Sequence, residues 1–117
     1  MGKLIIVATP IGNLEDITLR AVRVLGEADV LACEDTRHTR KIFERHGIRS
    51  PRTILSYREQ NEEHAGSRIL GFLAEGLFVA LCSDAGYPGL SDAGYRIISS
   101  ALDAGHVVEV LPGAGAI

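Results

Sequence analysis

The stretch of the chain best suited to hold a ligand combines glycine and proline with acidic and hydroxyl side chains. It reads SDAGYPGLSDAG at residues 83–94 and contains three glycines, one proline and two aspartates. Glycine lets a ligand approach the backbone closely, and the N–H groups at a helix start can hold a polar or anionic group. A tight turn needs only two residues, so a run of this length predicts a ligand-binding loop.

Two carboxylates, Glu34 and Asp35, follow the apolar run VLAC at 30–33. A carboxylate at the end of a strand can accept a proton from a substrate hydroxyl, or it can cap the helix that follows. We take both residues as candidates for the reacting side of a site. Asp84, in the ligand loop, is predicted to hold its own loop or polar groups of a ligand.

Positive charge is concentrated in one segment. Residues 37–58 contain seven Lys and Arg and one acid, a net charge of +6, which leaves −9 on the rest of a chain of net charge −3. Arg37, Lys41 and Arg45 recur at every fourth residue and predict one stripe on a helix. Such a stripe can contact the phosphates of a nucleic acid, although a solvated helix face is the alternative.

Several common sites are excluded or disfavoured. No G-x-x-x-x-G-K-[ST] motif is present, and the run TPIGN at 9–13 holds one glycine, which disfavours an ordinary dinucleotide fold. Cys33 and Cys82 lie inside apolar runs and are predicted to be buried thiols in a reducing cytosol. None of the four histidines is spaced from these cysteines as the ligands of a metal site would be; they are His38, His46, His64 and His106.

Composition and periodicity indicate an α/β fold. The 117 residues are 46% hydrophobic and 23% charged, as in one ordinary globular domain, and no apolar run reaches the length of a membrane span. Apolar runs predict strands at 3–9, 29–34, 53–56, 77–83 and 106–111. Helical periodicity between them predicts a five-stranded, mostly parallel sheet with helices on both faces. Ligands of such sheets bind beyond the carboxyl ends of the strands.

The expected helices have recognisable ends. The first is capped by Asp16 or Thr18 and the second by Asp35 or Thr36, while the fourth is capped by Ser91. Glycines end three of the four helices. The residues expected on the inward faces are Leu19, Val22 and Leu25; then Ile42 and Phe43; then Ala65, Ile69, Phe72 and Leu73 after a polar stretch at 58–64; and then Ile98, Ala101 and Leu102.

Four stretches together resemble the ribosomal RNA small-subunit methyltransferase I family of the tetrapyrrole methylase superfamily. They are VATPIGNLEDI at 7–17, ACEDTR at 32–37, SDAGYPGLSD at 83–92 and LPG at 111–113. The resemblance extends over essentially the whole chain. Two departures are visible: Ala93 stands where the family usually has proline, and Gly115 where a small polar residue is common.

The resemblance implies a two-domain cytoplasmic enzyme that binds S-adenosylmethionine between its domains and methylates the 2′-oxygen of a cytidine ribose in 16S rRNA of the small ribosomal subunit. Residues 1–117 would be the N-terminal domain, without the C-terminal one, of a homodimeric protein with no membrane partner. Glu34 and Asp35 are the catalytic candidates, and Arg37, Lys41 and Arg45 are the RNA-binding candidates. No metal is implied. The implied cofactor contacts are Pro10, Ser83, Asp84, Ala85, Gly86, Tyr87, Pro88, Leu90, Ser91, Leu111, Pro112 and Gly113.

Two other functions remain open. The first is a sibling enzyme that methylates carbon atoms of a tetrapyrrole. Such siblings carry a Gly-Gly-Asp-Pro-type loop, and SDAGYP at 83–88 argues against that assignment. The second is a non-catalytic module that binds the cofactor or RNA, which is what half of a site could do without a second domain.

Overall fold

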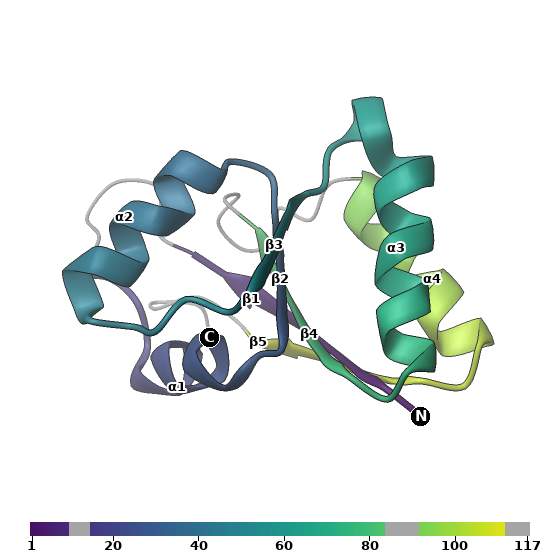
Figure 1. Cartoon of the computed structure of the whole chain (residues 1–117), viewed down its shortest axis with the longest axis horizontal. Coiled ribbons are helices and arrows are strands. Elements are labelled where there is room, and N and C mark those ends of the chain that lie inside the picture. Colours follow the sequence, from purple (N-terminus) through teal and green to yellow (C-terminus); the bar gives the residue numbers. More distant parts are fainter. Residues whose placement is uncertain (10–14, 84–91, 112–117) are drawn as a thin grey trace.

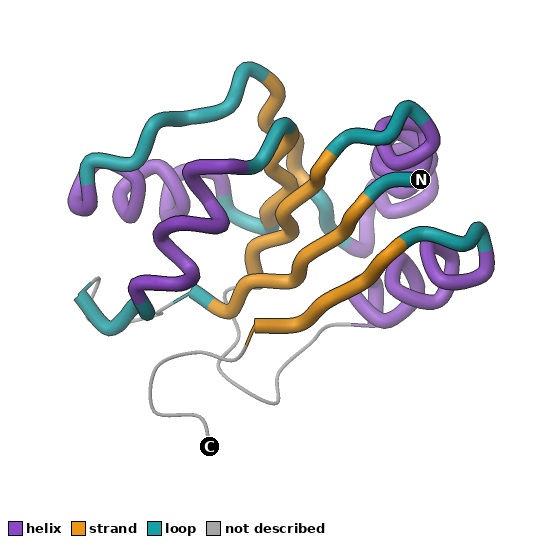
Figure 2. The backbone as a smooth tube through the Cα atoms, turned by 90° about the horizontal axis from the view of Figure 1, so that it is seen from below, coloured by secondary structure: helices purple, strands orange, loops and turns teal. Residues whose placement is uncertain are grey.

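The computed structural model describes residues 1–9, 15–83 and 92–111. Its elements alternate along the chain, and they form one sheet with two helices against each face (Figures 1 and 2). The elements are β1 (Lys3–Ala8), α1 (Leu19–Glu27), β2 (Val30–Cys33), α2 (Thr36–His46), β3 (Thr53–Ser56), the short 3₁₀ helix η1 (Glu59–Asn61), α3 (Glu62–Ala74), β4 (Phe78–Ser83), α4 (Asp92–Asp103) and β5 (Val107–Leu111).

The strand order is β3-β2-β4-β1-β5, and all the pairings are parallel. The predicted five-stranded sheet with helices on both faces is therefore confirmed. β4 is the middle strand of the sheet, and β1 lies beside it and pairs with it over six residues, from Lys3 with Phe78 to Ala8 with Ser83. Strands buried on both faces are typically continuous apolar runs, as Leu4–Val7 and Val79–Cys82 are.

Alternate side chains of each strand enter two separate cores. Leu4 and Ile6 of β1 pack towards α3 and α4, with Ile69, Leu73 and Ile97. The intervening residues of β1 face α1 and α2, where the core includes Leu25, Leu31, Cys33, Phe43 and Cys82. Both cysteines are buried thiols, as predicted.

The inward faces of two helices differ from the prediction. Leu19 is 86% exposed and Leu102 is 56% exposed. The side chains that are buried instead are Ala21, Val24 and Leu25 of α1 and Ile97 and Ala101 of α4. Leu19 is the first residue of α1 and Leu102 the second-to-last of α4. Side chains in the terminal turn of a helix can project past the sheet that the helix covers, so apolar periodicity overstates burial there.

Local side-chain chemistry explains where the helices begin and end. The Thr18 side chain accepts a hydrogen bond from the backbone N–H of Ala21, so Thr18 rather than Asp16 caps α1. Gly47 ends α2 in the left-handed conformation with a φ of 62°. The helix expected to follow the polar stretch at 58–64 already begins at Glu62, after η1.

A close approach of backbone to backbone requires glycine at position 2. A Cβ built on Gly2 would lie 2.6 Å from Cα of Leu73. Gly2 cannot easily retreat, because its N–H donates to Nδ1 of His106 at 3.0 Å and its carbonyl accepts from Val107 at 3.1 Å. We expect Gly2→Ala to lower the free energy of unfolding by about 1–3 kcal/mol through overpacking.

Gly71 provides the matched control for urea unfolding. It is an exposed residue of α3 with no heavy atom within 4 Å of an added Cβ. Gly71→Ala should therefore stabilise the protein, by about 0.5–1 kcal/mol, because alanine favours the helix. Equal stabilities of the Gly2→Ala variant and the parent protein would show that the N-terminal strand is not held as described.

Candidate functional site

The sheet has a topological switch point between the neighbouring strands β1 and β4. After β1 the chain crosses the α1–α2 face to reach β2, and after β4 it crosses the opposite face through α4 to reach β5 (Figure 1). The connections that leave the neighbouring carboxyl ends of β1 and β4 therefore diverge. Divergence of this kind opens a crevice at the carboxyl edge of α/β sheets, where their ligands bind.

The two strand ends at this point are fastened to each other. Both the backbone N–H and the side-chain Oγ1 of Thr9 donate to the carbonyl of Ser83, at 2.9 and 3.0 Å. Thr9 is 3% exposed and Ser83 is 7% exposed. The pair fixes the points from which both flanking loops depart. Ser83, one of the cofactor contacts predicted from the sequence, is therefore buried at the switch point.

Leu111 ends β5, and its side chain is buried in the core that faces α1 and α2. Its neighbour in the sheet is Val7 of β1, so the end of β5 also belongs to this edge. The other predicted cofactor contacts lie outside the described residues; they are Pro10, Asp84, Ala85, Gly86, Tyr87, Pro88, Leu90, Ser91, Pro112 and Gly113.

Glu34 and Asp35 follow β2 on the same carboxyl edge, because β2 pairs with β4. Their environments differ. Oδ1 of Asp35 accepts from the backbone N–H groups of Arg37 at 2.9 Å and His38 at 3.3 Å, which caps α2. The hydrogen bond from His38, assisted by that from Arg37, lowers the pKa of Asp35 below its ordinary value. Glu34 is half-buried, and within the described ranges its side chain has no recorded hydrogen bond.

An arginine that was not among the sequence-predicted site residues lies beside this pair. Nε of Arg58, at the end of β3, donates to the backbone carbonyl of Glu34 at 2.8 Å. The turn that carries Arg58 is itself fixed, since Oδ1 of Asn61 accepts from the Arg58 N–H at 2.8 Å and Nδ2 of Asn61 donates to the Ser56 carbonyl at 3.0 Å. The polar run at 58–64, directly after a strand, was the available sequence signal.

Tyr57 shows that the same turn is anchored in the core. Its N–H donates to the Cys33 carbonyl at 2.9 Å, which extends the β2–β3 ladder, and its ring is buried among the side chains facing α3 and α4. Burial, together with the charge of Glu62, raises the pKa of Tyr57 to about 12. Arg96 of α4 holds Glu62 through two 2.6 Å contacts and so joins α3 to α4.

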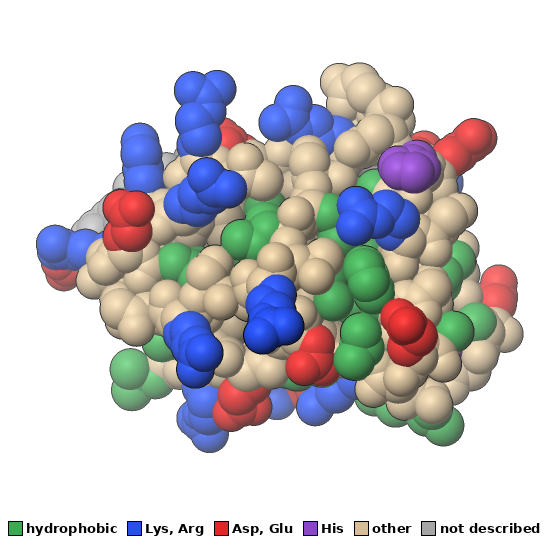
Figure 3. All heavy atoms as spheres, in the orientation of Figure 1, with side chains coloured by type: hydrophobic (Ala, Val, Ile, Leu, Met, Phe, Trp, Pro, Cys, Tyr) green, Lys and Arg blue, Asp and Glu red, His purple; other side chains and the backbone are tan. Residues whose placement is uncertain are grey.

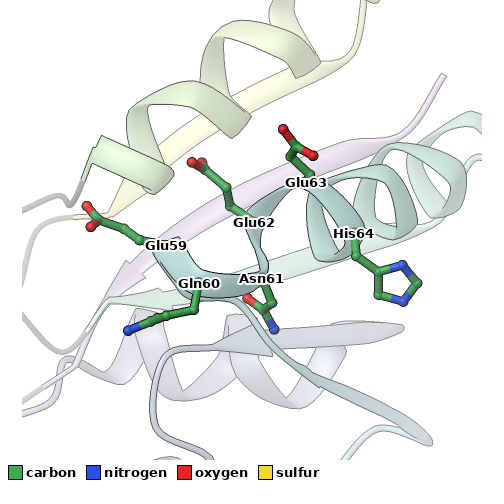
Figure 4. A pocket seen from close by; sticks show the side chains of 6 residues that line it. All are labelled: Glu59, Gln60, Asn61, Glu62, Glu63 and His64. Atoms are coloured by element: carbon green, nitrogen blue, oxygen red, sulfur yellow. The ribbon is translucent and has the colours of Figure 1, made fainter.

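The residues that follow Arg58 line an open hollow on the surface (Figure 4). Glu62 and Glu63 point towards α4, whereas His64 points away from it. The lining residues are Glu59, Gln60, Asn61, Glu62, Glu63 and His64. Within the described ranges, no group of three or more His, Cys, Asp or Glu side chains is arranged to hold a metal ion.

The predicted basic stripe is only partly available to a ligand. Arg37, Lys41 and Arg45 are all exposed on α2, but Arg45 forms an ion pair with Glu15. Arg40 and Arg49 are also exposed and, among the described residues, belong to no recorded ion pair. Figure 3 shows Lys and Arg side chains gathered on the half of the molecule that contains α2.

Substitutions of Asp35 can distinguish its role as the cap of α2 from its predicted role as a catalytic carboxylate. Asparagine is as good a cap as aspartate, so Asp35→Asn should keep the urea midpoint close to that of the parent at pH 7, whereas Asp35→Ala should lower it. The folded-state pKa of Asp35 is depressed, so its ionised form contributes stability above the unfolded pKa of about 3.9. That contribution is lost as the pH falls through the lower folded pKa.

Urea unfolding at pH 7 and at pH 3 measures both effects. The difference between the parent and Asp35→Ala should become smaller at the lower pH, where protonation weakens the carboxylate cap of the parent. A midpoint of Asp35→Ala equal to that of the parent at pH 7 would contradict the capping role.

Among the described residues, every helix is too short or too polar to span a membrane.

Two curated relatives carry the name ribosomal RNA small subunit methyltransferase I. The protein from Halalkalibacterium halodurans is 50% identical over 98% of this chain, and that from Thermotoga maritima is 46% identical over all of it. The chain spans 39% and 52% of the length of these two relatives, respectively.

Solved structures share the fold. Uroporphyrin-III C-methyltransferase from Thermus thermophilus superimposes with a TM-score of 0.73 at 25% identity, over 97% of this chain and 48% of that one. A structure described as the same enzyme complexed with S-adenosyl homocysteine gives a TM-score of 0.68 at 22% identity, over 97% and 45%. The family model of tetrapyrrole (corrin/porphyrin) methylases matches residues 3–117. This chain therefore belongs to the tetrapyrrole methylase family.

Proposed function

We propose that this chain provides the cofactor edge and an RNA-binding face of an S-adenosylmethionine-dependent methyltransferase that acts on the 2′-oxygen of a cytidine ribose in 16S rRNA. Identity of 46–50% to relatives named as ribosomal RNA methyltransferases carries the proposal. The solved tetrapyrrole methyltransferase above is only 25% identical, which favours RNA over a tetrapyrrole as substrate. The whole protein is proposed to act as a homodimer in the cytoplasm, on the small ribosomal subunit.

The switch point is the proposed place of the cofactor. Thr9 and Ser83 hold the ends of β1 and β4 together, and Leu111 ends the strand beside β1. The loops that follow these three strand ends contain the predicted cofactor contacts. When bound, S-adenosylmethionine supplies an electrophilic methyl group on a sulfonium.

The chain's own part in the reaction is to orient the ribose and accept a proton. A ribose hydroxyl is a poor nucleophile while protonated, so a carboxylate beside the 2′-oxygen assists the displacement. Glu34 suits this role better than Asp35. The Asp35 carboxylate already accepts two backbone hydrogen bonds as a helix cap, and its lowered pKa makes it a weaker base.

Transfer of labelled methyl groups tests the function. The gene product that contains this chain is incubated with labelled S-adenosylmethionine and small ribosomal subunits that lack the modification, and the RNA is digested to nucleosides. We expect label in 2′-O-methylcytidine. Glu34→Gln should lower kcat by about 10²–10⁴-fold, with the affinity for S-adenosylhomocysteine unchanged, whereas Asp35→Asn should remain close to the parent.

Each other outcome changes the proposal differently. Label in a tetrapyrrole but not in RNA would establish the sibling activity. Cofactor binding without transfer to either substrate would leave a binding module. Full activity of Glu34→Gln would remove that residue from the reaction.

The basic face makes a separate prediction about RNA affinity. Arg40→Glu combined with Lys41→Glu should weaken binding to the small subunit and reduce the slope of log Kd against log salt, because phosphate contacts release counterions. Arg68→Glu on α3 reverses one exposed arginine on another helix and is the matched control for each of the two single variants, Arg40→Glu and Lys41→Glu. Equal slopes for the double variant and the parent would identify α2 as a solvated face.

A further inference from the structure

Arg58 is held in a defined orientation at the carboxyl edge of the sheet. Its backbone N–H is bound by Asn61, and its Nε is bound by the carbonyl of Glu34. The guanidinium therefore reaches across from the end of β3 to the end of β2. One of its five N–H groups is used in this contact, and the side chain as a whole is exposed.

The charge of Arg58 is not neutralised by a salt bridge in the described part of the chain. Arg20, Arg45 and Arg96 are each paired with a carboxylate, and no such pair is recorded for Arg58. The nearby acids Asp35 and Glu59 form no ion pair with Arg58 in the described part of the chain. Asp35 caps α2, and Glu59 is the first residue of η1. A fixed planar guanidinium with two terminal amino groups available matches a phosphate in geometry as well as in charge.

The helix beside this edge also has an unusual charge arrangement. The first turn of α2 contains Arg37 and no acidic residue, so the Asp35 carboxylate at the N-cap is the negative charge described at this end of the helix, which itself carries partial positive charge. The positive charge of Arg37 does not stabilise that end of the helix. A negatively charged ligand at the edge of β2 and β3 would interact favourably with both Arg37 and Arg58.

We infer that Arg58 binds the phosphodiester group next to the target ribose and thereby positions the 2′-hydroxyl towards Glu34. This inference rests on the proposed function. In a ribonucleotide, the 2′-hydroxyl and the 3′-phosphate are attached to neighbouring carbon atoms of one sugar. A phosphate fixed by Arg58 consequently limits the positions that the hydroxyl can take, and Glu34 is adjacent because Arg58 is bound to its carbonyl. Arg58 is a positioning residue in this arrangement.

Steady-state kinetics and salt dependence test this role in the full protein with small ribosomal subunits. Arg58→Gln should reduce kcat/KM by about 10- to 100-fold, as expected for loss of a charge-assisted hydrogen bond. It should also reduce the slope of log Kd against log salt by about one. Arg58→Lys should keep the slope, since the charge remains, but lose turnover, since the planar fork is absent.

Arg68→Gln is the matched control, because it removes the same charge from the exposed face of α3, where Arg68 lies over the ring of Phe72. Its kinetics and salt slope should equal those of the parent. Affinity for S-adenosylhomocysteine and the melting temperature, measured on every variant, show whether the fold is retained. Neither quantity depends on a phosphate contact.

The outcomes distinguish this inference from the proposed function. If the parent methylates RNA while folded Arg58→Gln keeps its kcat/KM and salt slope, the role of Arg58 is wrong and the function stands. Loss of activity by Arg58→Gln with an unchanged salt slope would also overturn the phosphate contact. If the parent neither binds nor methylates RNA, both proposals fail.

Discussion

Pairing of β1 with β4 is the interaction on which the rest of this fold depends. Both strands are apolar on both faces, so each needs a strand on either side and helices above and below. Their register aligns Ala8 with Ser83, and the two hydrogen bonds from Thr9 continue that register beyond the last ladder pair. The position of the switch point is thus a consequence of how two strands pair.

The order of the remaining strands brings two kinds of chemistry to one edge. β4 pairs with β1 on one side and with β2 on the other, and β2 pairs with β3. The predicted cofactor loops follow β1, β4 and β5, whereas Glu34 and Arg58 stand at the ends of β2 and β3. A methyl donor bound at the ends of β1 and β4 and a ribose bound at the ends of β2 and β3 would therefore lie next to each other, because β4 pairs directly with β2.

Features determined by nearby residues could be predicted from the sequence, and features determined by distant residues could not. Thr18 and Asp35 cap helices through backbone groups at most three residues away, so their roles follow from local chemistry. The contact of Arg58 is with a residue 24 positions earlier, and the partner of Arg45 is 30 positions earlier. Strand order is equally non-local, because alternating strands and helices are compatible with several orders.

The central place of β1 has a consequence for how the chain folds during synthesis. Lys3 pairs with Phe78 and with Val107, so β1 waits during synthesis for partners made at least 75 residues later. At about 5–20 residues per second, that interval lasts several seconds. The run Leu4–Val7 is fully buried in the folded protein. During translation it is an unpaired apolar strand, the kind of segment that chaperones protect.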